Sequence, residues 1–228
     1  MTRIRAATAR FLRPVAPFDL RHVEPVSKRF GCERGMPIDR RYIEAFLAAN
    51  VDRIRGRAME IASADYIRQF GGSRVTHIEV LHATAGNPEA TCVGDLAQPE
   101  TLPADYLDCF ICTQTLNFIY DFKSAIRGLH RILKPGGSAL VTLGGISQIS
   151  RYDMDRWGDY WRLTSKSAAL AFGEVFGAQV QVATYGNALA ACAFLQGLAV
   201  EDLPEPALLD RVDPNYQVIV AVLARKGD

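Results

Sequence analysis

Short apolar runs alternate with amphipathic segments through the middle of the chain. The clearest run, residues 106–113, is apolar at nearly every position, as a strand covered on both faces requires. Residues 123–133 carry apolar side chains at helical spacing, and Pro135-Gly136-Gly137 then prevents the helix from continuing. This alternation of buried strands and amphipathic helices is typical of an α/β protein with a mostly parallel sheet.

The same alternation over the whole chain predicts about seven strands in a doubly wound, Rossmann-like sheet. The expected strands are residues 57–62, 75–81, 90–93, 106–113, 138–143, 178–185 and 216–224. The expected helices are residues 40–51, 66–70, 123–133 and 165–176. Ligands of such sheets bind at the carboxyl ends of the strands, so the loops after positions 61, 81, 93 and 113 form the candidate site.

Composition narrows the class of protein further. The chain has 228 residues, of which 49% are hydrophobic and 22% are charged, as in ordinary globular domains. Its 26 Lys and Arg residues balance 25 Asp and Glu residues, so we expect no nucleic acid partner. No run approaches the ~18 apolar residues of a membrane span. The basic segment at residues 3–13 lacks an apolar core of secretory length, so we expect a cytoplasmic protein.

Five cysteines are scattered along the chain, a pattern that does not indicate a secreted disulfide framework. Cys109 and Cys112 form a C-x-x-C pair inside the expected strand 106–113. That spacing places their side chains on opposite faces of the sheet. We therefore expect buried free thiols rather than a redox or metal pair, and we expect no metal site.

Four prolines within the first 37 positions make a long regular element there improbable. We therefore divide the chain into an N-terminal arm and lid, residues 1–38, and a domain of residues 39–228. Asp39 precedes the expected helix 40–51 and is a good N-cap residue for it.

Several segments occur in an order and spacing that resemble a known family. They are Arg57-Ala58-Met59-Glu60-Ile61-Ala62, Val93-Gly94-Asp95-Leu96, Leu102-Pro103, the run from Leu107 to Leu116, and Arg131-Ile132-Leu133-Lys134-Pro135-Gly136-Gly137. In this order they are similar to the class I S-adenosylmethionine-dependent methyltransferases, and most of all to the small stand-alone type 11 kind. The resemblance covers residues 56–143 in detail and implies S-adenosylmethionine as the cofactor.

The resemblance implies roles for acidic residues near the ends of two strands. Glu60 would lie close to the methionine amino group and to a helix N-terminus, and capping of that helix is the local alternative. Asp95 would accept a hydrogen bond from the adenine amino group, with Leu96 supplying the neighbouring backbone amide. For Asp95 the alternative is a local turn bond.

The ribose and methyl-transfer positions are also implied by the resemblance. The family commonly has an acid at the end of the second strand, where this chain has His82. That histidine either bonds one ribose hydroxyl or is a solvated loop residue. Thr113 ends the fourth strand and Gln114 follows it, where the methyl group and the acceptor meet in this fold, and we expect both to border the cofactor. Asn117 follows them and is expected to contact the acceptor.

The chain departs from the family in the loop after the first strand. The family pattern is an acid followed by three alternating glycines, which let the backbone approach the cofactor. This chain has Ala62, Ala64 and Tyr66 at those positions. Three explanations stay open: Ser63 holds the cofactor in a wider turn, Ser63 is the N-cap of the next helix, or the pocket no longer binds S-adenosylmethionine. Under the first two explanations, Ala62 and Ser63 contact the cofactor.

An aromatic and charged stretch near residues 145–164 follows the fifth strand and is the expected acceptor rim. Trp and Tyr beside Asp and Arg are the residue types that stack on and hydrogen-bond sugars. The expected acceptor-binding residues are Asn117, Tyr152, Trp157, Trp161 and Arg162, and the candidate bases are Asp153 and Tyr160. The alternative is a rim helix whose aromatic side chains pack on the core.

These expectations lead to an S-adenosylmethionine-dependent methyltransferase that methylates a hydroxyl group of a small polar acceptor, such as a sugar unit of a glycan or natural product. The lid adds Arg40 or Tyr42, either of which could reach the cofactor carboxylate; a capped helix with exposed arginines is the alternative. The competing hypothesis is a methyltransferase-like protein without methyl transfer, either a partner-binding subunit or a different reaction in the same pocket. The expected partner is the small-molecule acceptor, and a homodimer stays open.

Overall fold

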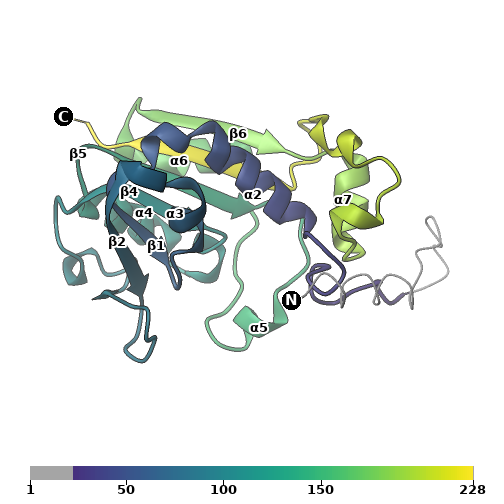
Figure 1. Ribbon diagram of the computed structural model, residues 1–228, viewed down its shortest axis with the longest axis horizontal. Helices are drawn as coiled ribbons and strands as arrows, with labels where there is room; N and C mark the ends of the chain where they lie inside the picture. Colours follow the sequence, from purple (N-terminus) through teal and green to yellow (C-terminus); the bar gives the residue numbers. More distant parts are fainter. Residues whose placement is uncertain (1–22, 228) are drawn as a thin grey trace.

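The computed structural model describes residues 23–227, and its centre is a seven-stranded sheet in the order β3-β2-β1-β4-β5-β7-β6 (Figure 1). The strands are β1 (Gly56–Ile61), β2 (Val75–His82), β3 (Cys92–Val93), β4 (Leu107–Thr113), β5 (Leu133–Gly144), β6 (Val180–Tyr185) and β7 (Ile219–Arg225). Strands β1 to β5 pair in parallel, whereas β7 is antiparallel to both β5 and β6. The predicted doubly wound, Rossmann-like sheet is confirmed.

Helices cover both faces of this sheet. The helices of the described residues are α2 (Ile38–Ala49), α3 (Asp65–Phe70), α4 (Phe122–Ile132), α5 (Arg151–Met154), α6 (Ser165–Phe176) and α7 (Ala188–Leu195). Apolar side chains of α2 and α3 pack on one face, and those of α4 and α6 pack on the other. Cys109 belongs to the first of these cores and Cys112 to the second, and both are buried free thiols. The prediction for this cysteine pair is therefore confirmed.

Every strand differs from its predicted limits by at least one residue, and β5 differs most. Strand β5 begins at Leu133 instead of residue 138, although α4 ends at Ile132 as the Pro-Gly-Gly sequence requires. Residues 134–137 stay extended and form an irregularity in the pairing with β4, where Gly136 takes a φ of 75° that favours glycine. Strand β3 is shorter than expected, because only two of its residues pair with β2.

Helix α7 was not predicted from the sequence. Its residues are almost all apolar, so they show no helical alternation of polar and apolar positions. Asn187 caps the helix by accepting a hydrogen bond from the Ala190 N–H at 2.9 Å. The helix packs in a separate apolar cluster that also includes Ile38 and Tyr42 of α2.

The N-terminal segment of residues 23–37 is bound to the α7 region, at the end of the molecule away from β2 (Figure 1). Arg34 and Asp202 form a buried ion pair with bonds of 2.7 and 2.9 Å, and Pro37 forms a β-bridge with Ala199. Pro37, not Asp39, occupies the N-cap position of α2, so the predicted capping role of Asp39 is wrong. The predicted basic segment at residues 3–13 lies outside the described residues.

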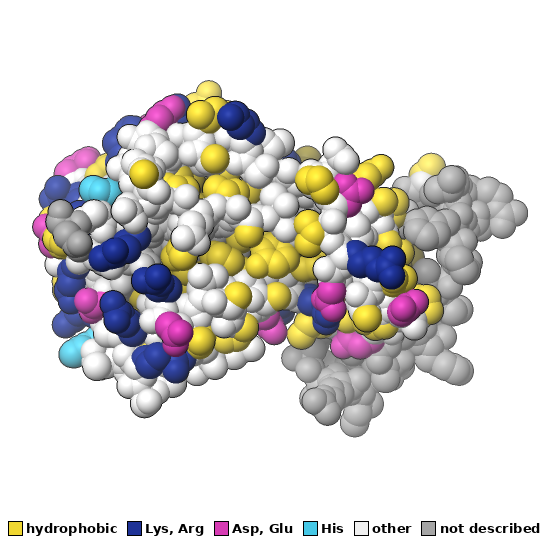
Figure 2. Space-filling view, turned by 90° about the horizontal axis from the view of Figure 1, so that it is seen from above, with side chains coloured by type: hydrophobic (Ala, Val, Ile, Leu, Met, Phe, Trp, Pro, Cys, Tyr) yellow, Lys and Arg dark blue, Asp and Glu magenta, His cyan; other side chains and the backbone are white. Residues whose placement is uncertain are grey.

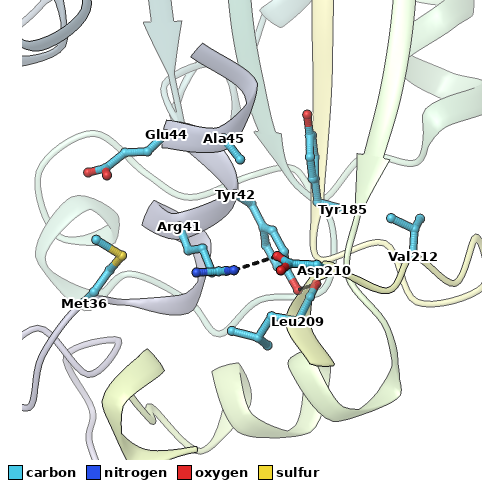
Figure 3. A pocket seen from close by; sticks show the side chains of 9 residues that line it. All are labelled: Met36, Arg41, Tyr42, Glu44, Ala45, Tyr185, Leu209, Asp210 and Val212. Carbon is cyan, nitrogen blue, oxygen red and sulfur yellow. Dashed lines mark hydrogen bonds and ion pairs between the residues drawn. The ribbon is translucent and has the colours of Figure 1, made fainter. Parts of the chain in front are cut away.

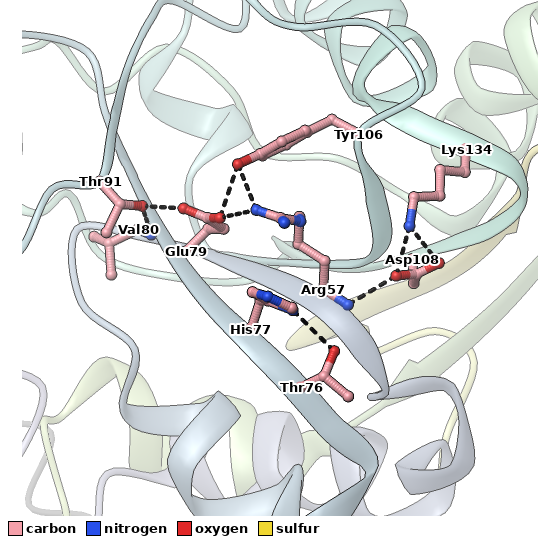
Figure 4. A network of polar contacts seen from close by, with 9 residues as sticks. All are labelled: Arg57, Thr76, His77, Glu79, Val80, Thr91, Tyr106, Asp108 and Lys134. Atoms are coloured by element: carbon pink, nitrogen blue, oxygen red, sulfur yellow. Dashed lines mark hydrogen bonds and ion pairs between the residues drawn. The ribbon is translucent and has the colours of Figure 1, made fainter.

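A polar network joins β1, β2 and the segment before β4 (Figure 4). The Arg57 guanidinium donates to Glu79 Oε1 at 2.5 Å and to the Tyr106 hydroxyl at 2.6 Å. Burial raises the pKa of Glu79, but hydrogen bonds from Thr91, Tyr106 and Arg57 outweigh it and leave the pKa lowered. Glu79 is thus held as a carboxylate by groups of the fold itself, and this network stabilises the strand pairing.

The surface of one face carries mixed charges. Figure 2 shows acidic and basic side chains interspersed over the sheet part of the molecule, with hydrophobic side chains gathered along its middle. Within residues 23–227, no helix combines the length and the apolar character needed to cross a membrane.

Candidate cofactor and acceptor sites

The predicted cofactor residues lie at the carboxyl ends of four neighbouring strands. Because β3, β2, β1 and β4 are parallel and adjacent, the residues that follow them share one edge of the sheet. The loop after β1 bonds directly to β2 through the Ala62 N–H, which donates to the Leu81 carbonyl at 3.0 Å. The residues brought to or beside this edge are Glu60, Ala62, Ser63, His82, Asp95, Leu96, Thr113 and Gln114.

Ala62 makes the turn at the end of β1 without a glycine. Its φ is +66°, in the left-handed region that favours glycine and that costs an L-residue about 1–2 kcal/mol. This position is the first glycine of the family pattern. Ala64, at the second glycine position, has an ordinary φ of −120°, and its methyl group is fully buried. The glycine-type turn therefore persists, with strain confined to Ala62.

Glu60 is buried beneath this turn, with 4% of its surface exposed. Its Oε2 accepts a hydrogen bond from the Ile67 N–H of α3 at 3.0 Å. Burial raises the pKa of Glu60 from 4.5 to about 7, although backbone hydrogen bonds from Ile67 and Tyr66 partly offset this effect. Glu60 thus caps α3 from below and fixes the loop. Capping of this helix was the alternative to a contact with the methionine amino group.

Ser63 is not the N-cap of α3, because Ala64 occupies that position without a side-chain bond. The Ser63 hydroxyl instead donates to Asp65 Oδ2 at 3.1 Å. A residue that the sequence did not single out, Asn87, donates from Nδ2 to the Ala62 carbonyl at 2.7 Å. Asn87 therefore ties the loop after β2 to the loop after β1, across the predicted ribose position.

His82 ends β2, where the resemblance places the ribose contact. One of its ring nitrogens, Nδ1, lies 2.7 Å from the Thr84 carbonyl oxygen, so the imidazole is held by its own loop. The ring meets that of Trp157 edge-on, with the centroids 6.1 Å apart. The predicted rim therefore reaches the ribose side of the cofactor edge, not only the acceptor side.

Asp95 forms the local turn bond that was the alternative to a bond with adenine. Its Oδ1 accepts the Ala97 N–H at 2.8 Å, whereas its Oδ2 has only a long contact of 3.4 Å with the Gln98 amide. One carboxylate oxygen is thus used by the turn and the other remains available to an amino group. Leu96 is buried beside it, with 3% of its surface exposed. The donors and acceptors at this end of the edge fit a nucleoside.

A cavity of about 190 Å³ lies next to the carboxyl end of β4. It is lined by Phe30, Asp39, Gln114, Asn117, Phe118, Ser147, Gln148, Ser150, Asp153, Asp159 and Arg162. The predicted residues Asn117, Asp153 and Arg162 are among them. Gln114 belongs both to this cavity and to the cofactor edge, so the two sites adjoin.

Asp159 and Arg162 form a fixed ion pair in the wall of this cavity. The guanidinium donates to both carboxylate oxygens, at 2.5 and 2.8 Å, and the Ser150 N–H adds a bond of 3.0 Å. Burial raises the pKa of Asp159, but these hydrogen bonds outweigh it and leave the pKa lowered. Arg162 is therefore largely occupied in supporting the wall.

Asn117 has a buried side-chain oxygen that accepts no hydrogen bond from the described residues. Only 6% of its surface is exposed, and Oδ1 has no hydrogen-bond partner among the described residues. The Asn117 backbone carbonyl, by contrast, accepts the N–H groups of Tyr160 and Trp161. An unpaired buried acceptor costs about 1–3 kcal/mol, so a ligand that donates a hydrogen bond there gains affinity.

The aromatic residues of the rim lie outside the cavity. Trp161 donates from Nε1 to the Tyr120 carbonyl at 3.1 Å, and its ring packs on Phe122 with centroids 5.3 Å apart. Tyr160 is 48% exposed and its hydroxyl donates to the Trp157 carbonyl at 3.1 Å. The structure therefore does not bring Tyr160, a candidate base, to the acceptor cavity. Trp161 likewise packs beside the cavity, as expected from the alternative in which the rim aromatic side chains pack on the core.

Two carboxylates remain as candidate bases in the cavity. Asp153 accepts the Ser150 hydroxyl at 2.5 Å and lies in α5. Asp39, which sequence analysis treated only as a helix cap, also lines the cavity, and burial raises its pKa from 3.8 to about 6. In the sequence, the position of Asp39 before an amphipathic helix indicated only a helix cap. That local pattern carries no information about the cavity.

Tyr42, predicted as a possible contact to the cofactor carboxylate, faces a different cavity (Figure 3). Its hydroxyl donates to the Leu209 carbonyl at 2.9 Å, and its ring stacks on Tyr185 with centroids 5.6 Å apart. This cavity, of about 370 Å³, lies at the β6 end of the sheet, and an Arg41–Asp210 ion pair of 2.6 Å crosses it. The hydroxyl and ring of Tyr42 are therefore engaged at this cavity, which none of the other predicted cofactor residues lines.

Comparison with known proteins agrees with this architecture. Residues 61–141 match the family model described as a methyltransferase domain, which is the region that contains the predicted cofactor edge. No curated protein sequence matches the chain. The matched region is less than half of the chain, and together with the strand order it agrees with the resemblance to class I methyltransferases of the type 11 kind.

Solved structures share the fold at low sequence identity. An S-adenosylmethionine-dependent methyltransferase from Archaeoglobus fulgidus has a TM-score of 0.54 at 9% identity, covering 82% of this chain and 94% of its own. The N-methyltransferase NodS from Bradyrhizobium japonicum, solved with S-adenosyl-L-homocysteine, has a TM-score of 0.52 at 12% identity, covering 85% and 89%. The [4+2]-cyclase SpnF has a TM-score of 0.51 at 15% identity, covering 82% and 80%. These likenesses show the fold.

The strain at Ala62 can be measured directly. Ala62→Gly should raise the free energy of unfolding by about 0.5–1 kcal/mol, because relief of the left-handed strain exceeds the entropy cost of glycine. Ala64→Gly is the matched control and should lower it, because that position has an ordinary φ and a buried methyl group. Urea denaturation of both variants provides the test. Destabilisation of similar size in both would show that Ala62 is not strained.

The buried carboxyl of Glu60 predicts a pH-dependent stability difference. Because its pKa rises to about 7 in the folded protein, the folded state binds this proton more tightly than the unfolded state does. The resulting stabilisation is complete below about pH 4.5 and is lost as the pH rises through 7. Relative to the parent, Glu60→Gln should therefore become more stable with rising pH, by about 1–3 kcal/mol at pH 8.

Urea denaturation at pH 5, 6, 7 and 8 measures this difference. The exposed Glu100→Gln variant controls for the loss of one negative charge. A Glu60→Gln difference that stays constant over this pH range would contradict the buried, proton-binding state of Glu60.

Proposed function

We propose that this protein transfers a methyl group from S-adenosylmethionine to a hydroxyl group of a small polar acceptor, such as a sugar unit of a glycan or natural product. The observation that carries the proposal is the contact between the two sites. Gln114 directly follows β4, has a φ of +48° and lines the acceptor cavity, while its backbone N–H donates to the Thr142 carbonyl at 2.9 Å. A donor bound along the cofactor edge would thus present its methyl group toward the cavity.

The residues of the edge suit the nucleoside part of the cofactor. Asp95 Oδ2 is available to accept the adenine amino group, and the imidazole of His82 has its second ring nitrogen for a ribose hydroxyl. Glu60 and Asn87 hold the intervening loop from below and from the side. When bound, S-adenosylmethionine supplies an electrophilic methyl group on a sulfonium sulfur.

The residues of the cavity suit a hydroxyl-bearing acceptor. Asn117 Oδ1 is an unused acceptor, and the carboxylates of Asp39 and Asp153 also accept hydrogen bonds, so the cavity favours ligands rich in donors. Outside the cavity, the exposed ring of Trp157 offers a stacking surface, as does the face of the Tyr152 ring that Arg156 does not cover. Holding the acceptor oxygen in line with the methyl carbon can supply much of the rate acceleration.

A second candidate is a protein of this fold that does not transfer methyl groups. It is favoured by the loop after β1, where no glycine is present and Asn87 bridges across the ribose position. The similarity to the [4+2]-cyclase SpnF shows that a protein with a related fold is named for a different reaction. A partner-binding subunit would fit the same observations.

Methyl transfer from methyl-labelled S-adenosylmethionine to a panel of monosaccharides, glycosides and phenols separates these candidates. We expect label in a hydroxyl-bearing acceptor. Asp95→Asn should raise the KM for S-adenosylmethionine roughly tenfold, because it keeps an oxygen for the Ala97 N–H but loses the acceptor for adenine. Asp52→Asn, on an exposed residue, is the control. Absence of transfer to every acceptor would favour the second candidate, and an unchanged KM in Asp95→Asn would place adenine elsewhere.

A further inference from the structure

The acceptor cavity contains three carboxylates, and their hydrogen bonds differ. Asp159 is neutralised by Arg162, and Asp153 accepts a short hydrogen bond from the Ser150 hydroxyl. In the described part of the chain, the Asp39 carboxylate accepts hydrogen bonds only from the backbone at the start of α2, with the Arg40 N–H at 2.8 Å. Of the three carboxylates, Asp39 is thus the one that accepts no hydrogen bond from a side chain of the described residues.

Asp39 also occupies the place where a base is needed. It lies in the first turn of α2 and lines the cavity that Gln114 shares with the cofactor edge. After burial, the charge of Asp39 also helps to raise the pKa of Tyr66, in the helix after the cofactor loop. Asp39 therefore lines the acceptor cavity and acts electrostatically on α3.

The charged and titratable groups around Asp39 come from several elements. They are Arg40 of α2, Cys32 of the N-terminal segment, Tyr66 of α3, and Asp153, Asp159 and Arg162 of the rim. Burial outweighs the attraction of Arg40 and raises the pKa of Asp39 to about 6. A carboxylate with a pKa near 6 is a stronger base than an ordinary aspartate and is still ionised at neutral pH.

We propose that Asp39 is the general base of the reaction and that Asn117 selects an acceptor with a second hydroxyl group beside the one that is methylated. The inference rests on the proposed methyl transfer. The acceptor oxygen forms a bond to the methyl carbon, the carbon–sulfur bond breaks with its electron pair passing to sulfur, and the hydroxyl proton passes to Asp39. The neighbouring hydroxyl donates to Asn117 Oδ1, which has no partner within residues 23–227. The substrate class is therefore a polyol or a sugar with adjacent hydroxyl groups.

The test compares Asp39→Asn with Asp153→Asn, using the acceptor that the parent methylates. Asp39→Asn should lower kcat by about 10²–10⁴-fold. It should also abolish the fall in kcat on the acid side of the pH profile, and Asp39→Glu should restore part of the activity. Asp153→Asn should keep that acid limb. Retention of the limb in Asp39→Asn, or its loss only in Asp153→Asn, would overturn the assignment.

Two readouts do not depend on turnover. S-Adenosylhomocysteine affinity, measured by calorimetry, should change less than twofold in Asp39→Asn; a large loss would make Asp39 a cofactor ligand and overturn the proposal. Carbon-13 NMR of the carboxyl groups should show a resonance with a midpoint near pH 6 that is absent from Asp39→Asn. An ordinary midpoint for that resonance would also overturn it.

A deoxy analogue tests the acceptor class. Removing the hydroxyl next to the methylated one should lower kcat/KM about tenfold in the parent but much less in Asn117→Ala. Equal losses in both proteins would overturn the role of Asn117. Absence of turnover by the parent would overturn the proposed function and this inference together, whereas normal turnover by Asp39→Asn would overturn the inference alone.

Discussion

The chain has to leave the central strand β1 through a sharp turn and enter α3 at once, and Glu60 holds that turn in place. Its buried carboxyl group bonds the Ile67 N–H from beneath, while Ala62 adopts a left-handed conformation above it. Without this arrangement the loop would not lie at the edge shared by β1, β2 and β4. The cofactor edge and the acceptor cavity are both defined relative to that loop.

This arrangement explains how a loop without glycine keeps the backbone geometry of the glycine-rich loop of the family. Only one of the three family positions, that of Ala62, has a backbone conformation that favours glycine. Its strain is small compared with the burial of two apolar cores, and Asn87 fixes the loop from the neighbouring strand end. The loop departs from the family in composition more than in shape, which is consistent with a retained cofactor site.

The α/β architecture was predictable because its strands and helices have distinct hydrophobic periods. Helix α6 has the limits expected from its sequence, whereas α7 lacks polar residues that would reveal a helical period. The site was less predictable. The unpaired oxygen of Asn117 and the position of Asp39 beside the cavity depend on residues distant in sequence, which no local pattern encodes. Tyr160 and Trp161 were selected by composition, yet their polar groups are used by the fold itself.

We infer that the edge formed by β1, β2 and β4 holds S-adenosylmethionine despite the altered loop. Calorimetric titration of the full chain with S-adenosylhomocysteine tests this binding directly. We expect one site per chain with a dissociation constant in the micromolar range, and therefore a higher melting temperature at millimolar ligand. No titration heat at several temperatures, together with an unchanged melting temperature, would contradict it.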